Sequence, residues 1–108
     1  ACSEGMGSPE YRSAQERLVA LGPDAFLASL FARDRAEIDE WQTQMQLKST
    51  SHTRVQLYTG GLAGADRKLT GVEMVDDLER AIVEALARAG SPDLAVIPEG
   101  PYVVPVVA

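Results

Sequence analysis

Two stretches of the sequence carry residue types that could take part in chemistry. The first contains Cys2, followed by Gly5 and Gly7 ahead of a predicted helix start. A helix N-terminus lowers the pKa of a nearby thiol, and the N–H groups of a glycine-rich turn can bind an anion. A thiol nucleophile also needs a base, and His52 is the only histidine, in a polar run with no sequence link to Cys2. A buried cysteine and a tight turn are therefore the simpler interpretation, with His52 in a solvated loop.

The second stretch, DEWQTQMQ, contains the only tryptophan of the chain. Trp41 shares helical spacing with Ile38 and Met45, a pattern typical of a core-facing helix side. Gln44 follows Trp41 by three residues, so the indole and the amide lie on one helix face. A wide aromatic ring beside an amide could also close over a small polar ligand. Both the core and the binding interpretation of Trp41 stay open at this point.

Composition excludes several classes of function. The chain has 108 residues, one domain's worth, and a net charge of −6, which argues against nucleic acid as a partner. It has no apolar run of about 18 residues, so no membrane span is expected. Its single cysteine cannot form an internal disulfide, which fits the reducing cytoplasm. With one cysteine and one histidine, a structural zinc site is not expected.

Helices are expected mainly in the first half of the chain. Ser8 and Pro9 match a helix cap and first position, and a helix stop at Gly22 follows. A third helix is predicted to begin at Asp34, where the spacing to Glu37 fits a capping box. Another capping box precedes a helix with a clear apolar stripe, at Asp76 and Glu79. The expected helices cover residues 9–21, 23–32, 34 to beyond 45, and 77–89.

The second half changes to strand patterns. Apolar and polar side chains alternate over residues 53–60, which predicts a strand. The short segment 71–75 contains β-branched residues and is a second predicted strand, with a loop between the two. Residues 93–100 form an apolar run typical of a buried strand, and Pro105 confines a last strand at 102–107 to a sheet edge. A strand, a crossover helix and a parallel strand indicate one α/β domain over residues 1–108. We expect a Rossmann-like layered sheet of mostly parallel strands that lacks a strand N-terminal to residue 1.

Three stretches, ACSEGMG, DEWQTQ and LAVIPEGPYVVP, together resemble the C-terminal part of the nickel-dependent lactate racemase family. Their order and spacing match over nearly the whole chain. The resemblance implies that the first motif ends a strand of an α/β domain. It also implies that the parent enzyme isomerises lactate or a related 2-hydroxy acid by reversible hydride transfer. The hydride acceptor in that family is a nickel-pincer nucleotide, held by an N-terminal domain that also supplies the acid–base and nickel-ligating histidines.

The resemblance implies substrate-binding roles for two residues of this chain. Trp41 corresponds to a tryptophan that lines the substrate side of the cleft, and Gln44 matches the same motif. No residue of this chain matches a catalytic, cofactor-binding or metal position of the family. Met6 stands where the family more often has histidine, which leaves room for a substrate other than lactate.

We therefore expect the chain to be the C-terminal part of a longer two-domain racemase or epimerase that is inactive alone. Its expected partners are the N-terminal catalytic domain and a small 2-hydroxy acid, and an exposed sheet edge would permit a homodimer. No cofactor is expected on this chain by itself. One alternative is a stand-alone acidic α/β module for ligand binding or protein interaction, and another is a small thiol enzyme that uses Cys2.

Overall fold

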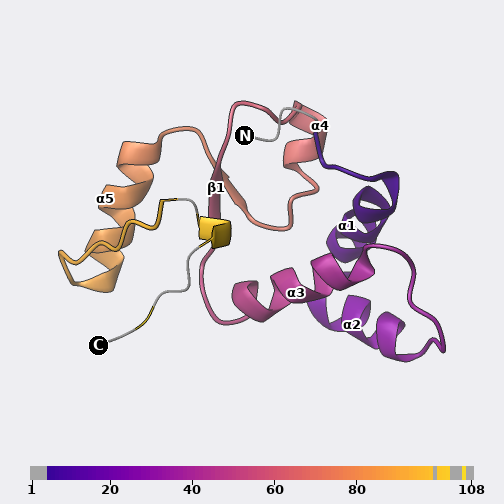
Figure 1. The fold of residues 1–108 in the computed structure, drawn as a ribbon. Helices are drawn as coiled ribbons and strands as arrows, with labels where there is room; N and C mark the ends of the chain where they lie inside the picture. Colours follow the sequence, from indigo (N-terminus) through magenta and orange to yellow (C-terminus); the bar gives the residue numbers. More distant parts are fainter. Residues whose placement is uncertain (1–4, 99, 103–105, 107–108) are drawn as a thin grey trace. The chain divides into compact units, whose positions relative to one another are not determined.

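The computed structural model describes residues 5–98, 100–102 and 106. It has a mixed helix and strand architecture (Figure 1). Two compact units are present, Ala1–Asp76 and Asp77–Ala108. The first contains α1 (Pro9–Leu21), α2 (Pro23–Phe31), α3 (Glu40–Thr50), β1 (Gln56–Tyr58), α4 (Gly64–Arg67) and β2 (Glu73–Val75). The second contains α5 (Leu78–Ala89) and the 3₁₀ helix η1 (Gly100–Tyr102).

The first two predicted helices are confirmed, and their local start and stop signals operate as expected. The Ser8 hydroxyl accepts a hydrogen bond from the backbone N–H of Tyr11 at 3.0 Å, and Pro9 takes the first helical position. Gly22, with a φ of 80°, ends α1, and Pro23 opens α2 directly after it. Because one residue separates them, α2 turns back against α1 at once.

The predicted start of the third helix at Asp34 is wrong, because α3 begins at Glu40. The capping box does not form, since the Glu37 side chain bonds to Arg33 and Arg17 instead. Asp39, the residue before the helix, has a left-handed φ of 65°. A left-handed residue cannot continue a right-handed helix, so the segment from Asp34 to Asp39 is a turn rather than a helical extension.

The core of the first unit lies among its three longer helices. Leu18, Phe26 and Leu47 form the buried cluster, with Leu27 and Leu30 packed against it. Phe26 is completely buried. Since these side chains come from α1, α2 and α3, one aromatic ring holds three helices together.

The apolar stripe of α3 does not face this core. Ile38, Trp41 and Met45 are 72%, 63% and 49% exposed. The buried side of α3 instead carries Glu40 and Thr43 together with Leu47. The core interpretation of Trp41 is therefore wrong. Buried polar side chains need partners, which here are Gln15 and Arg17 of α1 and Arg33, which follows α2.

The strand predictions at 53–60 and 71–75 are confirmed as short strands. They pair in parallel, with Gln56 opposite Glu73 and Tyr58 opposite Val75. The expected loop between them contains the short helix α4. The fold is thus mixed α/β at a coarse level, with a small two-stranded parallel sheet.

In the second unit, helix α5 is confirmed but its predicted cap is wrong. The Asp77 carboxylate caps the helix by accepting the N–H of Arg80 at 2.9 Å. Asp76 does not form the expected capping box and pairs with Arg67. Gly90 ends the helix with a φ of 65°, as its position predicts.

The buried strand predicted at residues 93–100 is also wrong. Residues 91–97 have no regular secondary structure, and Leu94, Val96 and Ile97 are exposed. Tyr102 lies in η1 rather than in a strand, and the rest of the predicted last strand lies outside the described residues, apart from residue 106, which has no regular structure. The run has the composition of a strand, but no described strand pairs with it.

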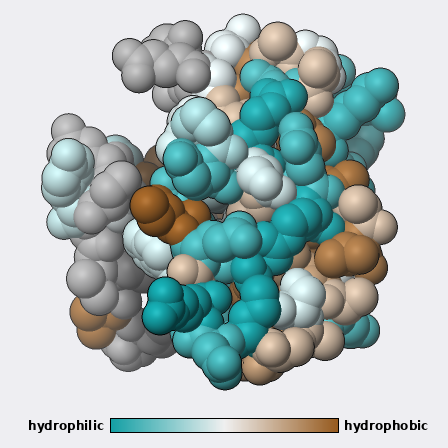
Figure 2. Space-filling model, turned by 90° about the vertical axis from the view of Figure 1, so that its right-hand side faces the viewer, coloured by the Kyte–Doolittle hydropathy of each residue, from teal (hydrophilic) through white to brown (hydrophobic). Residues whose placement is uncertain are grey.

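Figure 2 shows the side of the molecule on which α1 and α2 lie in Figure 1. Hydrophilic side chains cover the middle of this face, and hydrophobic ones form separate patches among them. No helix among the described residues has both the length and the apolar character needed to cross a bilayer.

Candidate functional site

Trp41 and Gln44, the two predicted substrate-binding residues, line the same pocket. Its volume is about 200 Å³. This volume lies below the roughly 300–1,000 Å³ typical of sites for drug-sized ligands, so the pocket fits only a small molecule. The lining residues come from the end of α2, the following turn and the start of α3: Leu30, Phe31, Arg33, Asp34, Ala36, Glu40, Trp41 and Gln44.

The Trp41 and Gln44 side chains make no hydrogen bond to another described residue. The indole N–H of Trp41 and the amide of Gln44 are therefore available to hydrogen-bond a ligand at this pocket. A flat apolar surface beside one or two polar groups is the usual composition of a small-molecule site.

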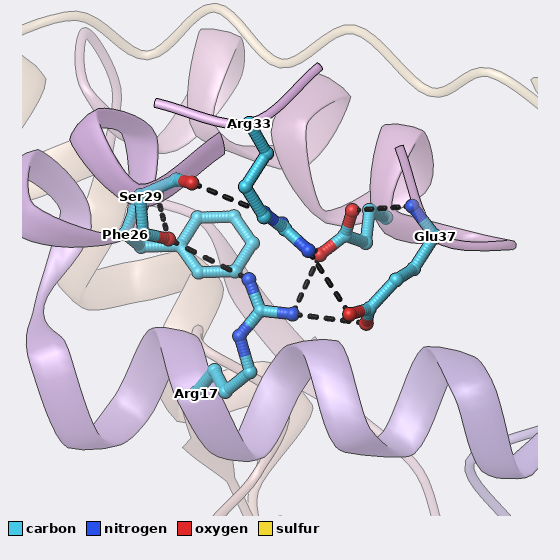
Figure 3. A network of polar contacts seen from close by, with 6 residues as sticks. Arg17, Phe26, Ser29, Arg33 and Glu37 are labelled. Carbon is cyan, nitrogen blue, oxygen red and sulfur yellow. Dashed lines mark hydrogen bonds and ion pairs between the residues drawn. The ribbon is translucent and has the colours of Figure 1, made fainter. Parts of the chain in front are cut away.

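Two of the three charged side chains at this pocket, Arg33 and Glu40, belong to a neutral network (Figure 3), and the third, Asp34, does not. The Glu40 carboxylate is only 3% exposed and accepts hydrogen bonds from Arg17, Arg33 and, at 2.7 Å, the backbone N–H of Glu37. The Glu37 carboxylate accepts from Arg33 at 3.0 Å and from Arg17 at 3.2 Å. Arg33 also donates to the backbone carbonyl of Ser29 at 3.1 Å. Two arginines and two glutamates thus cancel each other's charge, and the network holds the pocket wall in place.

This network also rests on the hydrophobic core. The guanidinium carbon of Arg17 lies 5.4 Å from the centroid of the Phe26 ring, in cation–π geometry (Figure 3). Phe26 in turn packs against Leu18 and Leu47 in the hydrophobic core. The wall of the Trp41 pocket is therefore anchored to a completely buried side chain of the core.

Glu40 is ionised over the whole physiological range. Burial by itself raises the pKa of Glu40, but hydrogen bonds from Arg33, from the Glu37 backbone and from Arg17 outweigh it. Together they lower its pKa from 4.5 to about 2. A carboxylate held this way cannot donate a proton near neutral pH, so we assign it a structural role.

The same pKa shift predicts a loss of stability in acid. The folded pKa of Glu40 is lower than the unfolded one, so its stabilisation is complete above pH 4.5 and declines as the pH falls towards 2. At pH 3 the free energy of unfolding should be about 2 kcal/mol lower than at pH 7 through this group alone. Urea denaturation at several pH values measures the slope of the free energy of unfolding against pH. In the E40Q variant the slope between pH 5 and 3 should be much shallower, and an unchanged slope would contradict the assignment.

His52, expected in a solvated loop, is exposed but lines a second and larger pocket. This pocket lies between α2 and α3, has a volume of about 560 Å³, and also includes Gln44 and Phe31. No local sequence signal marks it, because its lining comes from two helices and depends on how they pack against each other. Cys2 lies outside the described residues, so the structure does not place it relative to His52. Gly5 and Gly7 have φ values of 74° and 87°, which confirms the tight-turn interpretation.

A second polar cluster, also missed from the sequence, joins α1 to α3. The Gln15 amide nitrogen donates to the hydroxyl of Tyr11 at 2.8 Å and to the Gln46 carbonyl oxygen at 2.7 Å, and contacts Thr43 at 3.3 Å. The Gln46 amide nitrogen donates in turn to the backbone carbonyl of Thr70 at 2.7 Å. Gln15 Oε1 is buried and accepts no hydrogen bond. The cluster joins α1 to α3 through side-chain hydrogen bonds.

The described residues include no group of three or more histidine, cysteine, aspartate or glutamate side chains that could hold a metal ion. The candidate site of the first unit is therefore the pocket of Trp41 and Gln44, bordered by the Arg33–Glu40 ion pair and by Asp34. Comparison of the chain with family models, curated proteins and solved structures gave no match.

Proposed function

We propose that this chain is the C-terminal part of a nickel-pincer-dependent racemase or epimerase of 2-hydroxy acids, in which it walls the substrate cleft. The proposal is carried by one observation, the exposed Trp41 that shares a small pocket with Gln44. Both residues stand in the motif through which the sequence resembles lactate racemases. A tryptophan at helical spacing with two other apolar residues would normally be buried.

Each pocket residue has a chemical task in this proposal. The Trp41 ring packs against the carbon skeleton of the substrate and excludes water from one side of it. The Gln44 amide donates a hydrogen bond to the carboxylate or the hydroxyl of the 2-hydroxy acid. Arg33 already donates to Ser29, Glu37 and Glu40, so it supports the wall rather than binding the substrate carboxylate.

The chemical step is assigned to the other domain of the parent enzyme. There a nickel-pincer nucleotide would supply a reversible acceptor for the hydride on the substrate C2 carbon. The described residues of this chain offer no metal-binding group, and no step through the cofactor is assigned to them. Their contribution is to bind and orient the acid, and positioning of this kind is worth several powers of ten in rate when complete.

The small sheet fits a larger Rossmann-like sheet in this proposal. β1 and β2 pair in parallel, and no other described strand pairs with either of them. Parallel sheets occur almost only with more strands and with both faces covered. We propose that a strand preceding residue 1 extends this sheet in the parent enzyme. In the isolated chain the same edges would permit pairing with a second copy.

The test uses the native polypeptide, captured from its source cells with an antibody raised against this chain. We expect a mass several times 11.6 kDa, bound nickel, and interconversion of the two enantiomers of a 2-hydroxy acid. In that enzyme W41A should lower kcat/KM by about 10- to 100-fold and Q44A by roughly 5-fold, through lost packing and one lost hydrogen bond.

M45A is the matched control, because Met45 is exposed on the same helix but does not line the pocket. Its kcat/KM should remain unchanged. A native mass near 11.6 kDa would overturn the proposal in favour of a stand-alone module. Unchanged kcat/KM in W41A would remove Trp41 from the substrate site.

A further inference from the structure

The larger pocket between α2 and α3 is polar at one end and apolar at the other. The two helices run in opposite directions (Figure 1), so the first turn of α2 and the last turn of α3 lie at the same end. Pro23 and Asp24 line that end from α2, and Thr50, Ser51 and His52 line it from the end of α3. Its volume of about 560 Å³ falls within the 300–1,000 Å³ typical of small-ligand sites.

The polar end presents both signs of charge without an internal partner. Asp24 and Lys48 line the pocket with His52, and all three are exposed. None of these side chains makes a hydrogen bond or an ion pair with another described residue, and Asp24 and Lys48 do not pair with each other. The carboxylate of Asp24 and the ammonium group of Lys48 are therefore both available to charged groups of a ligand at this pocket.

Apart from Gln44, the rest of the pocket is apolar. Leu27 and Leu47 belong to the core and its immediate surroundings, and their side chains form the floor. Phe31, which is 76% exposed, stands at the far end from Asp24. An exposed phenylalanine and two leucines can cover one face of an aromatic or branched aliphatic group.

We propose that this pocket binds a free α-amino acid with a large apolar side chain. The ligand carboxylate is held by Lys48 and His52, the ligand ammonium group is held by Asp24, and the side chain lies on Leu27, Leu47 and Phe31. A ligand with only a carboxylate would face Asp24 unpaired, and one with only an ammonium group would face Lys48. The site is independent of the proposed racemase function, although both pockets share Phe31 and Gln44.

Titrations followed by amide chemical shifts of the 108-residue chain test the proposal with three matched probes. L-phenylalanine carries both charges, 3-phenylpropionate only the carboxylate, and 2-phenylethylamine only the ammonium group. We expect L-phenylalanine to bind with a Kd of roughly 2 mM, a strength usual for its number of atoms. The shifts should centre on Leu27, Leu47 and Lys48. The other two probes should bind at least about 3-fold more weakly, because each loses one exposed ion pair.

Variants at the two charged positions sharpen the result. D24N and K48Q should each weaken L-phenylalanine binding by roughly 3- to 5-fold. K68Q removes an exposed lysine outside this pocket and should leave the Kd unchanged. Circular dichroism shows whether each variant keeps its helices, since Asp24 and Lys48 also lie in helix end turns.

Three outcomes would overturn the proposal. They are no shifts with L-phenylalanine up to 20-fold above the expected Kd, equal binding of all three probes, or binding that D24N and K48Q leave intact. None of these outcomes bears on racemase activity, which is read from W41A in the native enzyme.

Discussion

Replacing Phe26 with alanine is expected to lower the free energy of unfolding of the first unit by about 4 kcal/mol. Phe26 is completely buried in contact with Leu18 and Leu47. Its replacement leaves a cavity among α1, α2 and α3, and these helices cannot all move inward to fill it. The variant also removes the ring beneath the Arg17 guanidinium, which loosens the ion-pair network above it. A domain of this size has only about 5–15 kcal/mol of stability. Urea denaturation followed by circular dichroism at 222 nm measures the loss.

The matched control is F31A, since Phe26 and Phe31 are the two phenylalanines of the chain and both lie in α2. Phe31 is largely exposed, so its replacement should change the free energy of unfolding by less than about 0.5 kcal/mol. Similar losses in the two variants would contradict the core described here. A strongly destabilised F26A with a near-native F31A would support it.

The E40Q variant should lose about 3 kcal/mol at pH 7. Glutamine keeps the shape of the side chain but removes the charge that Arg17 and Arg33 both contact. Removing one member of a buried ion-pair network costs roughly 3–5 kcal/mol, because the remaining charges lose their partner. Arg17 and Arg33 are partly exposed and keep Glu37, which places the expected loss at the lower end of that range.

E16Q provides the comparison for that measurement. Glu16 forms an exposed pair with Arg12 four residues before it on α1, and such pairs contribute about 0.3–0.5 kcal/mol. E40Q should therefore cost several times more than E16Q under the same conditions. Equal costs would show that burial of the Glu40 carboxylate adds nothing to the strength of its contacts.

Local signals were sufficient to predict most of the helices. The caps at Ser8 and Gly22 act through neighbouring backbone groups, so sequence proximity alone reveals them. The start of α3 shows the limit of this reasoning. Asp34 and Glu37 have the spacing of a capping box, but Glu37 finds Arg17 from another helix, 20 residues away in sequence. A short-range sequence pattern cannot show that the ion pair with Arg17 replaces the capping box.

The candidate site was only half predictable. Trp41 and Gln44 come from one motif, and helical spacing correctly placed them together. The face of α3 that they occupy was not predictable, because it depends on which side chains can be buried. Glu40 and Thr43 are polar, yet they take the inner side since α1 offers them hydrogen-bond partners. The pocket of Asp24, Lys48 and His52 requires knowledge of how α2 and α3 run relative to each other.

The buried amide of Gln15 and the partly buried amide of Gln46 determine how α1 and α3 are aligned along their lengths. Leucines at these positions could slide by one helical turn and still pack, because apolar contacts have no direction. The amide of Gln15 meets the amide of Gln46 and the hydroxyl of Thr43 at only one offset between the helices. Buried polar groups of this kind can specify a single arrangement even where they add little to net stability. Because Trp41 lies on α3, the same alignment fixes where the indole stands relative to the rest of the unit.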